Sequence, residues 1–241
     1  GPSGTAPYAG AGNGSKTTPV VGDNGTFSTG GGGGGGGLTS PAPDGGSSGG
    51  NGGSGTVVIR YQIGTVNTSD AKASGGSVSF YNNKTIHVFT GSGEFTAPGS
   101  FDETLEYVII GGGGAGGGRS FRGGGGGAGA VRHGTTAIDN TGPGNPSTTT
   151  VQVGAGGMYF APEGPSGNGT SSYFGTPITS PGGGMGSGYE SPYAGIAGGS
   201  GGGAGGYPAD ADGGTSSGDP FPGNPADTSP ANGWGYDGGD T

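Results

Sequence analysis

The sequence predicts a mainly β protein in which a short-stranded β-sandwich is joined to a bundle of packed polyglycine II helices, extended helices of the polyproline II type. Glycine supplies 72 of the 241 residues. The apolar residues gather in short β-branched or aromatic stretches, which are typical of strands. No window shows the periodicity and end caps of an amphipathic α-helix, so essentially no α-helix is expected.

Four stretches are predicted to be β-strands. Each is rich in β-branched or aromatic residues and is bounded by Gly, Pro or Asn. They are residues 56–61, 85–90, 105–110 and 149–153.

Glycine runs directly adjoin these strands. Residues 30–37 are all glycine, and runs 111–118 and 123–130 contain only alanine besides glycine. Glycine loses more backbone entropy on folding than any other residue, so a folded run requires a structure that only glycine permits. Extended helices without Cβ atoms can approach closely and hydrogen-bond to one another. Flexible linkers are the alternative.

The packed interpretation makes predictions at single positions. A lone alanine or serine in a run is expected at the bundle surface, because the middle leaves no room for a Cβ. The glycines expected to pack inside the bundle are Gly33, Gly34, Gly113 and Gly125.

Charge and composition exclude several classes of function. The formal charge of −9 comes from 16 acidic and 7 basic residues, which argues against a nucleic-acid partner because phosphates require a basic face. The absence of cysteine excludes disulfides and thiolate metal sites. No stretch approaches the roughly 20 apolar residues of a membrane span.

No catalytic residue is predicted, and the protein is not expected to be an enzyme. A catalytic triad needs a histidine oriented by a carboxylate, whereas His87 is expected in a strand and His133 in a turn. Two distant histidines cannot complete a zinc shell. Calcium is the one cofactor for which oxygen ligands occur, and solvated acidic loops are the alternative interpretation of the same residues, which are Asp210, Asp212, Asp237 and Asp240.

The order of several sequence blocks resembles a known family. Residues 87–96, followed by the strand at 105–110 and its glycine run, are similar to the glycine-rich domain of tail fibres and other appendages of bacteriophages, especially marine phages. Further blocks of that family match residues 123–134, 151–157 and 167–175, and its closing block matches residues 52–61.

The closing block precedes the opening block in this chain. Residues 1–62 are therefore expected to be the C-terminal part of one glycine-rich unit, residues 63–75 a linker, and residues 76–241 a second unit that lacks its closing strand. Either the natural protein carries such units in tandem, or a neighbouring subunit supplies the missing strand.

The resemblance implies a structural or adhesive segment of a phage tail fibre, located on the virion or outside the cell. The expected partners are further copies of the chain, in an oligomer or filament, and a cell-surface polysaccharide or outer-membrane protein. The alternative is a self-assembling extracellular filament or matrix protein whose subunits exchange strands.

Two groups of residues are candidates for receptor binding, because arginine and aromatic side chains dominate binding hot spots. The alternatives are that the arginines cap carbonyl groups at helix ends and that the aromatic rings pack a long loop over the core. The first group interrupts a glycine run and the second lies near the C-terminus: Arg119, Phe121 and Arg122, then Tyr207, Trp234 and Tyr236.

Overall fold

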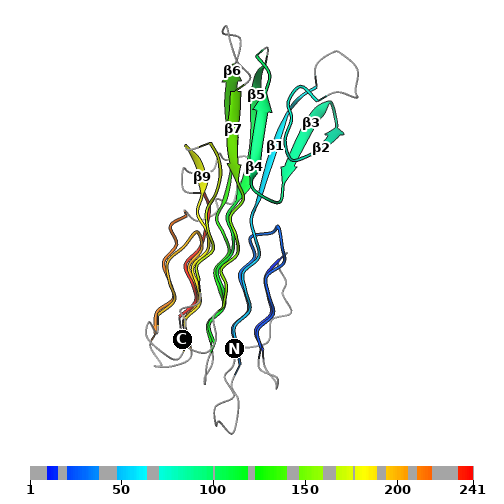
Figure 1. Cartoon of the computed structure of the whole chain (residues 1–241). Coiled ribbons are helices and arrows are strands. Elements are labelled where there is room, and N and C mark those ends of the chain that lie inside the picture. The colour runs from blue at the N-terminus through cyan, green and yellow to red at the C-terminus, as the bar shows by residue number, and fades with distance from the viewer. Residues whose placement is uncertain are drawn as a thin grey trace.

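The fold is described from a computed structural model, in which the strands gather at one end and extended segments run side by side to the other (Figure 1). The described residues are 10–15, 21–37, 48–63, 71–99, 101–118, 123–139, 147–159, 167–175, 177–188, 194–205, 211–218 and 233–240.

Two antiparallel sheets form the strand end of the molecule. The five-stranded sheet has the order β2-β3-β1-β5-β6 and contains β1 (Thr56–Gln62), β2 (Ser77–Tyr81), β3 (Lys84–Phe89), β5 (Asp102–Ile110) and β6 (Val131–Asp139). The four-stranded sheet has the order β4-β7-β8-β9 and contains β4 (Gly93–Ala97), β7 (Ser147–Gln152), β8 (Ser172–Phe174) and β9 (Ile178–Ser180).

The mainly β prediction is confirmed. The four predicted strands correspond to β1, β3, β5 and β7, while the other strands were not predicted. The described residues contain no helix, and hence none long and apolar enough to cross a membrane.

Alternation of buried and exposed residues explains the strands. In β1, Val57, Ile59 and Tyr61 are buried while Arg60 and Gln62 are exposed, as expected for a strand with one face on a core. A two-residue turn joins β2 to β3. Its residues, Asn82 and Asn83, have φ values of 48° and 59°, the left-handed conformation that asparagine tolerates in tight hairpins.

An aromatic cluster fills the space between the sheets. The ring of Phe95 on β4 is fully buried and meets the rings of His87, Phe101 and Phe174 edge-to-face, with centroids 5.1, 6.0 and 5.6 Å away. Tyr61 completes the cluster, 5.1 Å from Phe101. Edge-to-face rings attract one another beyond their apolar burial, so this cluster joins both sheets.

Strand β1 lies in the middle of the five-stranded sheet. Val57 pairs with Phe89 of β3 on one side and with Ile109 of β5 on the other. The sequence block expected to close a glycine-rich unit therefore occupies a sheet with the opening block of the same chain. The division of the chain into units at residues 62 and 76 stays a prediction.

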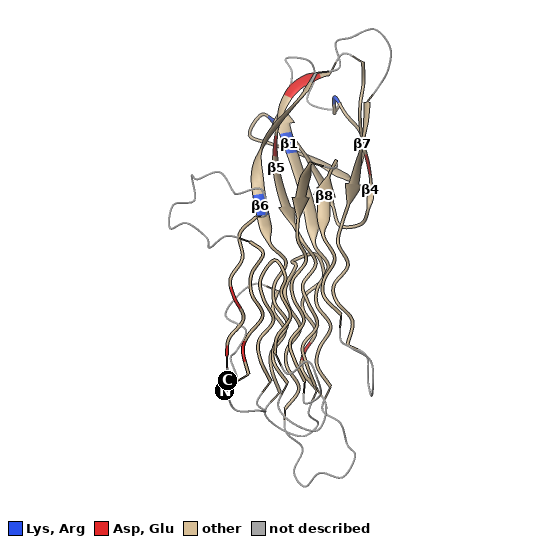
Figure 2. Ribbon diagram, turned by 90° about the vertical axis from the view of Figure 1, so that its left-hand side faces the viewer, with Lys and Arg blue, Asp and Glu red and all other residues tan. Residues whose placement is uncertain are grey.

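Six of the strands continue directly into extended, glycine-rich segments (Figure 1). Segments 48–55, 123–130 and 167–171 lead into β1, β6 and β8, whereas 111–118, 153–159 and 181–188 follow β5, β7 and β9. Figure 2 shows these segments stacked in layers below the sandwich. We call them the glycine lattice, together with residues 10–15, 21–26, 30–37, 194–205, 211–215 and 234–240.

Candidate functional site

The hydrogen bonds of the glycine lattice repeat every third residue. Along segment 111–118, the amides of Gly111, Gly114 and Gly117 donate to the carbonyl oxygens of Ala130, Gly127 and Gly124, at 3.0, 2.8 and 2.7 Å. The donors ascend while the acceptors descend, so the two segments are antiparallel. A spacing of three means that every third peptide faces the same neighbour, which differs from the alternation of a β-strand.

The remaining amides of this segment face other neighbours. Gly112 donates to Thr170, and Gly113 donates to Gly53. Segment 111–118 exchanges backbone hydrogen bonds with six segments in all: 30–37, 48–55, 123–130, 153–159, 167–171 and 181–188. A strand can pair with two neighbours, whereas this segment is bonded on all sides.

Glycine is required inside the lattice because backbone atoms occupy the place of a side chain. A Cβ added to Gly33, Gly34 or Gly113 would overlap the carbonyl oxygen of Gly50, Asn13 or Gly31, respectively. Gly125 differs, because the nearest heavy atom to an added Cβ would be the carbonyl oxygen of Gly33, 3.9 Å away. An alanine therefore fits at position 125, on the outside of the lattice.

The same geometry brings each interior Cα close to a carbonyl oxygen. With hydrogen in place of the Cβ, an α-hydrogen of Gly33 points at the oxygen of Gly50. Such Cα–H···O contacts are individually weak, but here they accompany N–H···O bonds between many neighbouring segments. Backbone contacts, rather than side-chain packing, hold this part of the molecule together.

In one lattice segment the residues other than glycine recur at every third position. In segment 48–55, Ser48, Asn51 and Ser54 are the only residues other than glycine. The Asn51 carboxamide oxygen accepts from the amide of Tyr159 at 2.7 Å. The expectation that alanine is excluded from the interior is wrong at Ala115, which is fully buried.

Two buried serines fasten the lattice to the sandwich. The hydroxyl of Ser172 on β8 donates to the carbonyl of Ile110 at 2.7 Å and accepts from the amide of Gly154 at 2.8 Å. The hydroxyl of Ser180 on β9 donates to the carbonyl of Ala130 at 2.6 Å. Both serines are fully buried and satisfy backbone groups where strand geometry changes to lattice geometry.

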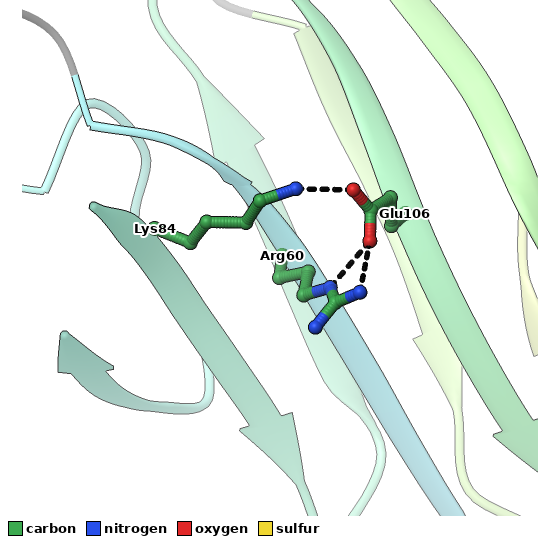
Figure 3. A network of polar contacts seen from close by, with 3 residues as sticks. All are labelled: Arg60, Lys84 and Glu106. Carbon is green, nitrogen blue, oxygen red and sulfur yellow. Dashed lines mark hydrogen bonds and ion pairs between the residues drawn. The ribbon is translucent and has the colours of Figure 1, made fainter. Parts of the chain in front are cut away.

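Charges lie on the outer face of the five-stranded sheet. Glu106 on β5 receives hydrogen bonds from Arg60 on β1 and Lys84 on β3 (Figure 3). The hydrogen bond from Lys84 is the main cause that lowers the pKa of Glu106, and the Arg60 guanidinium acts in the same direction. This cluster bridges three neighbouring strands.

A family model described as a glycine-rich domain matches residues 88–241, well over half of the chain. The chain belongs to the glycine-rich domain family. A search of curated proteins and a search of solved structures found no match. The matched part of the glycine-rich domain begins inside β3 and leaves out β1, although β1 lies between β3 and β5.

The candidate receptor residues of the glycine-rich domain are only partly described. Arg119, Phe121, Arg122 and Tyr207 lie outside the described residues. Trp234 is 5% exposed, and its backbone pairs with that of Val131 at the start of β6, so its ring offers little surface to a receptor. Tyr236 is 58% exposed.

The two histidines of the glycine-rich domain lie in strands. The expectation for His87 is confirmed, since it is buried in β3. The expectation of a turn at His133 is wrong: it lies in β6, and its ring centroid is 4.6 Å from that of Trp234. The turn was expected because His133 follows a glycine run. Gly134 pairs with Tyr107 in the sheet, and a Cβ at this position would overlap the Tyr107 ring.

Buried polar contacts fix the state of His87. Nδ1 of His87 donates to the carbonyl of Gly75 at 2.6 Å, because a carbonyl oxygen can only accept. Nε2 of the neutral ring then accepts from the Tyr61 hydroxyl at 3.1 Å, and that hydroxyl in turn accepts from the amide of Ala73 at 3.0 Å. This arrangement suits the neutral ring, and burial lowers the pKa of His87. Burial also raises the pKa of Tyr61.

The acidic residues near the C-terminus bond to backbone amides. Asp240 accepts from Gly213 at 2.8 Å and Asp237 from Ser216 at 2.5 Å, which ties segment 234–240 to residues 211–218. Asp210 lies outside the described residues. Within the described part of the chain, no group of three or more His, Asp or Glu side chains could hold a metal ion, and calcium binding stays a prediction.

Sequence reasoning missed the junction serines. Ser172 and Ser180 each occupy a three-residue strand beside a glycine-rich segment. The sequence signal that could have identified them is a serine at the point where a short apolar stretch adjoins a glycine-rich segment. Serine is common at turns for other reasons, so that signal does not separate a fastening role from a loop.

Proposed function

We propose that the chain is a structural segment of a bacteriophage appendage, a tail fibre, which extends from the virion towards the host surface. The observation that carries this proposal is the glycine lattice. Its segments are bonded through their backbones on several sides, and such a bundle resists bending because no segment can shift without breaking bonds to several neighbours. Membership of the glycine-rich domain family is consistent with it.

We also propose that the lattice segments are polyglycine II helices. Two observations support this: donors that face the same neighbour recur at every third residue, and backbone oxygens occupy the Cβ positions of interior glycines. At a rise of about 3.1 Å per residue, an eight-residue run such as 30–37 would span roughly 25 Å. A crystal structure with lattice φ and ψ values far from about −75° and +145° would contradict this assignment.

Exposed side chains of the glycine-rich domain are the proposed receptor contacts. A cell-surface polysaccharide or an outer-membrane protein is the proposed partner. Among the described candidates, Tyr236 has the exposure that a contact residue needs. The buried Trp234 instead supports its neighbours by packing against His133.

The second candidate function is a self-assembling extracellular filament whose subunits exchange strands. In this chain the central position between β3 and β5 is filled by β1, so that position needs no strand from another subunit. We therefore favour the appendage. Sedimentation over a range of protein concentrations distinguishes the two, because filaments would grow with concentration whereas an appendage segment would form particles of one size.

Electron cryo-microscopy of the native source material tests the appendage. The expected result is density for stacked, extended segments on a fibre attached to a virion. A continuous polymer without virions would contradict the proposal. Purified chain should also compete with phage for host adsorption, and Tyr236→Ala should weaken that competition more than Tyr81→Ala, a matched change at a residue 75% exposed on β2.

A further inference from the structure

A cleft lies between β6 and β7. These two strands lie on opposite sides of the sandwich (Figure 2). Its volume is about 450 Å³, within the range of about 300–1,000 Å³ that is usual for small-molecule sites. The lining residues come from β6, β7 and the β8–β9 hairpin: Thr136, Ile138, Thr148, Thr149, Thr150, Tyr173, Phe174, Gly175, Pro177 and Ile178.

The cleft exists because the β8–β9 hairpin is short. Strands β8 and β9 have three residues each, whereas β6 has nine and β7 has six. The hairpin turns at Gly175, whose φ is 61° and whose amide donates to the carbonyl of Thr150 at 2.9 Å. Beyond this turn, β6 and β7 continue with no strand of the hairpin between them.

Threonine side chains line the cleft from both sheets. Thr136 pairs with Leu105, and Thr149 pairs with Phe95. Both partners are fully buried in the core, and directly paired residues share a face of the sheet, so both threonines face inward. Within the described part of the chain, neither hydroxyl has a hydrogen-bond partner, which leaves each one able to donate and to accept.

The described residues that line the cleft are all uncharged, in a protein whose formal charge is −9. It combines threonine hydroxyls with an apolar floor that includes Phe174, Pro177 and Ile178. A charged ligand would lose its hydration here without gaining a countercharge, which is costly. A wholly apolar ligand would leave the threonine hydroxyls without partners. A ligand that suits both the threonine hydroxyls and the apolar floor is a neutral ring with hydroxyl groups on its edge and C–H groups on its faces.

We propose that this cleft binds a neutral saccharide. The inward hydroxyls of Thr136 and Thr149 bond to sugar hydroxyls, and the apolar floor packs against the face of a sugar ring. The site lies on the sandwich and not in the glycine lattice. It does not depend on the proposed appendage function and can be tested without any phage or host cell.

The test uses the whole chain on an array of neutral and of acidic oligosaccharides, followed by calorimetric titration of the neutral oligosaccharide that gives the strongest signal. Thr136→Trp fills the cleft and should abolish binding. Ala137→Trp is its matched control, because Ala137 is the next residue of β6 and is exposed on the opposite face. Thr136→Val replaces the hydroxyl with a methyl group of similar size and should weaken binding by about three- to tenfold.

Folding of each variant is checked by its melting temperature. If Thr136→Trp does not fold, Thr136→Val and Thr149→Val serve as the cleft variants against the same control. The proposal is supported when a neutral saccharide binds and the cleft variants, but not Ala137→Trp, weaken it. It is overturned if no neutral saccharide binds, if only acidic ones bind, or if the cleft variants leave neutral binding unchanged.

Discussion

The sandwich and the glycine lattice bury their chain in two different ways. In the sandwich, apolar side chains such as Ile59, Phe95 and Leu105 are fully buried between two sheets, and each strand bonds to at most two neighbours. In the lattice, the buried atoms belong mostly to the backbone, and segment 111–118 bonds to neighbours on all sides.

The difference shows what a fold needs besides an apolar core. Buried backbone N–H and C=O groups must be paired in either region. The sandwich adds the hydrophobic effect of its side chains, whereas the lattice replaces it with a higher density of backbone contacts. The two regions should therefore respond in opposite ways to added and removed side-chain atoms.

The largest effect is expected from adding one methyl group inside the lattice. In Gly33→Ala the new Cβ would overlap the carbonyl oxygen of Gly50, and this oxygen belongs to a backbone that other bonds hold in place. We expect a loss of more than about 4 kcal/mol in the free energy of unfolding, or failure to fold. Denaturant unfolding, followed by circular dichroism and tryptophan fluorescence, measures it.

Gly125→Ala is the control for this prediction. Its Cβ would have 3.9 Å to the nearest heavy atom, and Gly125 is not among the glycines with positive φ. The change should stabilise the protein by about 0.4–1 kcal/mol, because alanine has less backbone entropy to lose. Equal effects at positions 33 and 125 would show that the lattice does not exclude side chains.

The second largest effect is expected from removing a side chain in the sandwich. Phe95→Ala leaves a cavity among the rings of Tyr61, His87, Phe101 and Phe174 and should cost about 3–5 kcal/mol. Phe95→Leu should cost much less, since cores tolerate changes of similar volume. Phe80→Ala on β2, where the side chain is 39% exposed, is the matched control, and a similar loss there would contradict a core centred on Phe95.

The sequence was enough to predict the strands whose own composition is apolar, such as β1 and β5. It did not predict β6, whose residues Arg132, His133 and Gly134 have no strand propensity as a group and become a strand by pairing with β5 along its whole length. The need for glycine at Gly33 and Gly113 was predicted by the packed interpretation of the glycine runs, in which no Cβ fits inside the bundle. The open position at Gly125 was not, since it depends on which segments surround it.

Tertiary structure decides the exposure of the candidate site residues even more than it decides the strands. Trp234 and Tyr236 are similar in sequence context, but one is buried against His133 and the other is exposed. The cleft beside Thr136 follows from the relative lengths of strands in two sheets, which no local pattern contains.

A third, intermediate effect is expected where the two regions join. Ser172→Ala removes the hydroxyl that donates to the carbonyl of Ile110 and accepts from the amide of Gly154, so the buried Gly154 amide loses this partner. We expect a loss of about 1–3 kcal/mol. Ser171→Ala, one residue earlier and half-buried, should change the free energy of unfolding by less than about 0.5 kcal/mol. Equal losses would mean that the junction does not rely on this hydroxyl.

A smaller effect, dependent on pH, is expected in the sandwich alone. Burial lowers the pKa of His87 in the folded state, so the unfolded chain binds more protons once the pH falls below the ordinary histidine value of about 6.5. The contribution of neutral His87 to stability is therefore complete above that pH and decreases as the pH falls towards the folded-state pKa. Unfolding of wild type and His87→Gln between pH 7.5 and 5 should show a flatter dependence for the variant, and parallel curves would exclude His87 as the cause.

The smallest effect is expected from the ion pairs on the outer face of the five-stranded sheet. Lys84 and Arg60 lower the pKa of Glu106, so its charged form stabilises the fold above the usual glutamate pKa, and this contribution is lost as the pH falls through the lowered value. Because the Arg60 side chain is 53% exposed, Glu106→Gln should cost less than about 1 kcal/mol at neutral pH. The cost should shrink further in about 1 M salt, where charges are screened within a few ångströms. A large loss that salt does not reduce would mean that this cluster acts as a buried network, and that the sandwich depends on polar contacts as the lattice does.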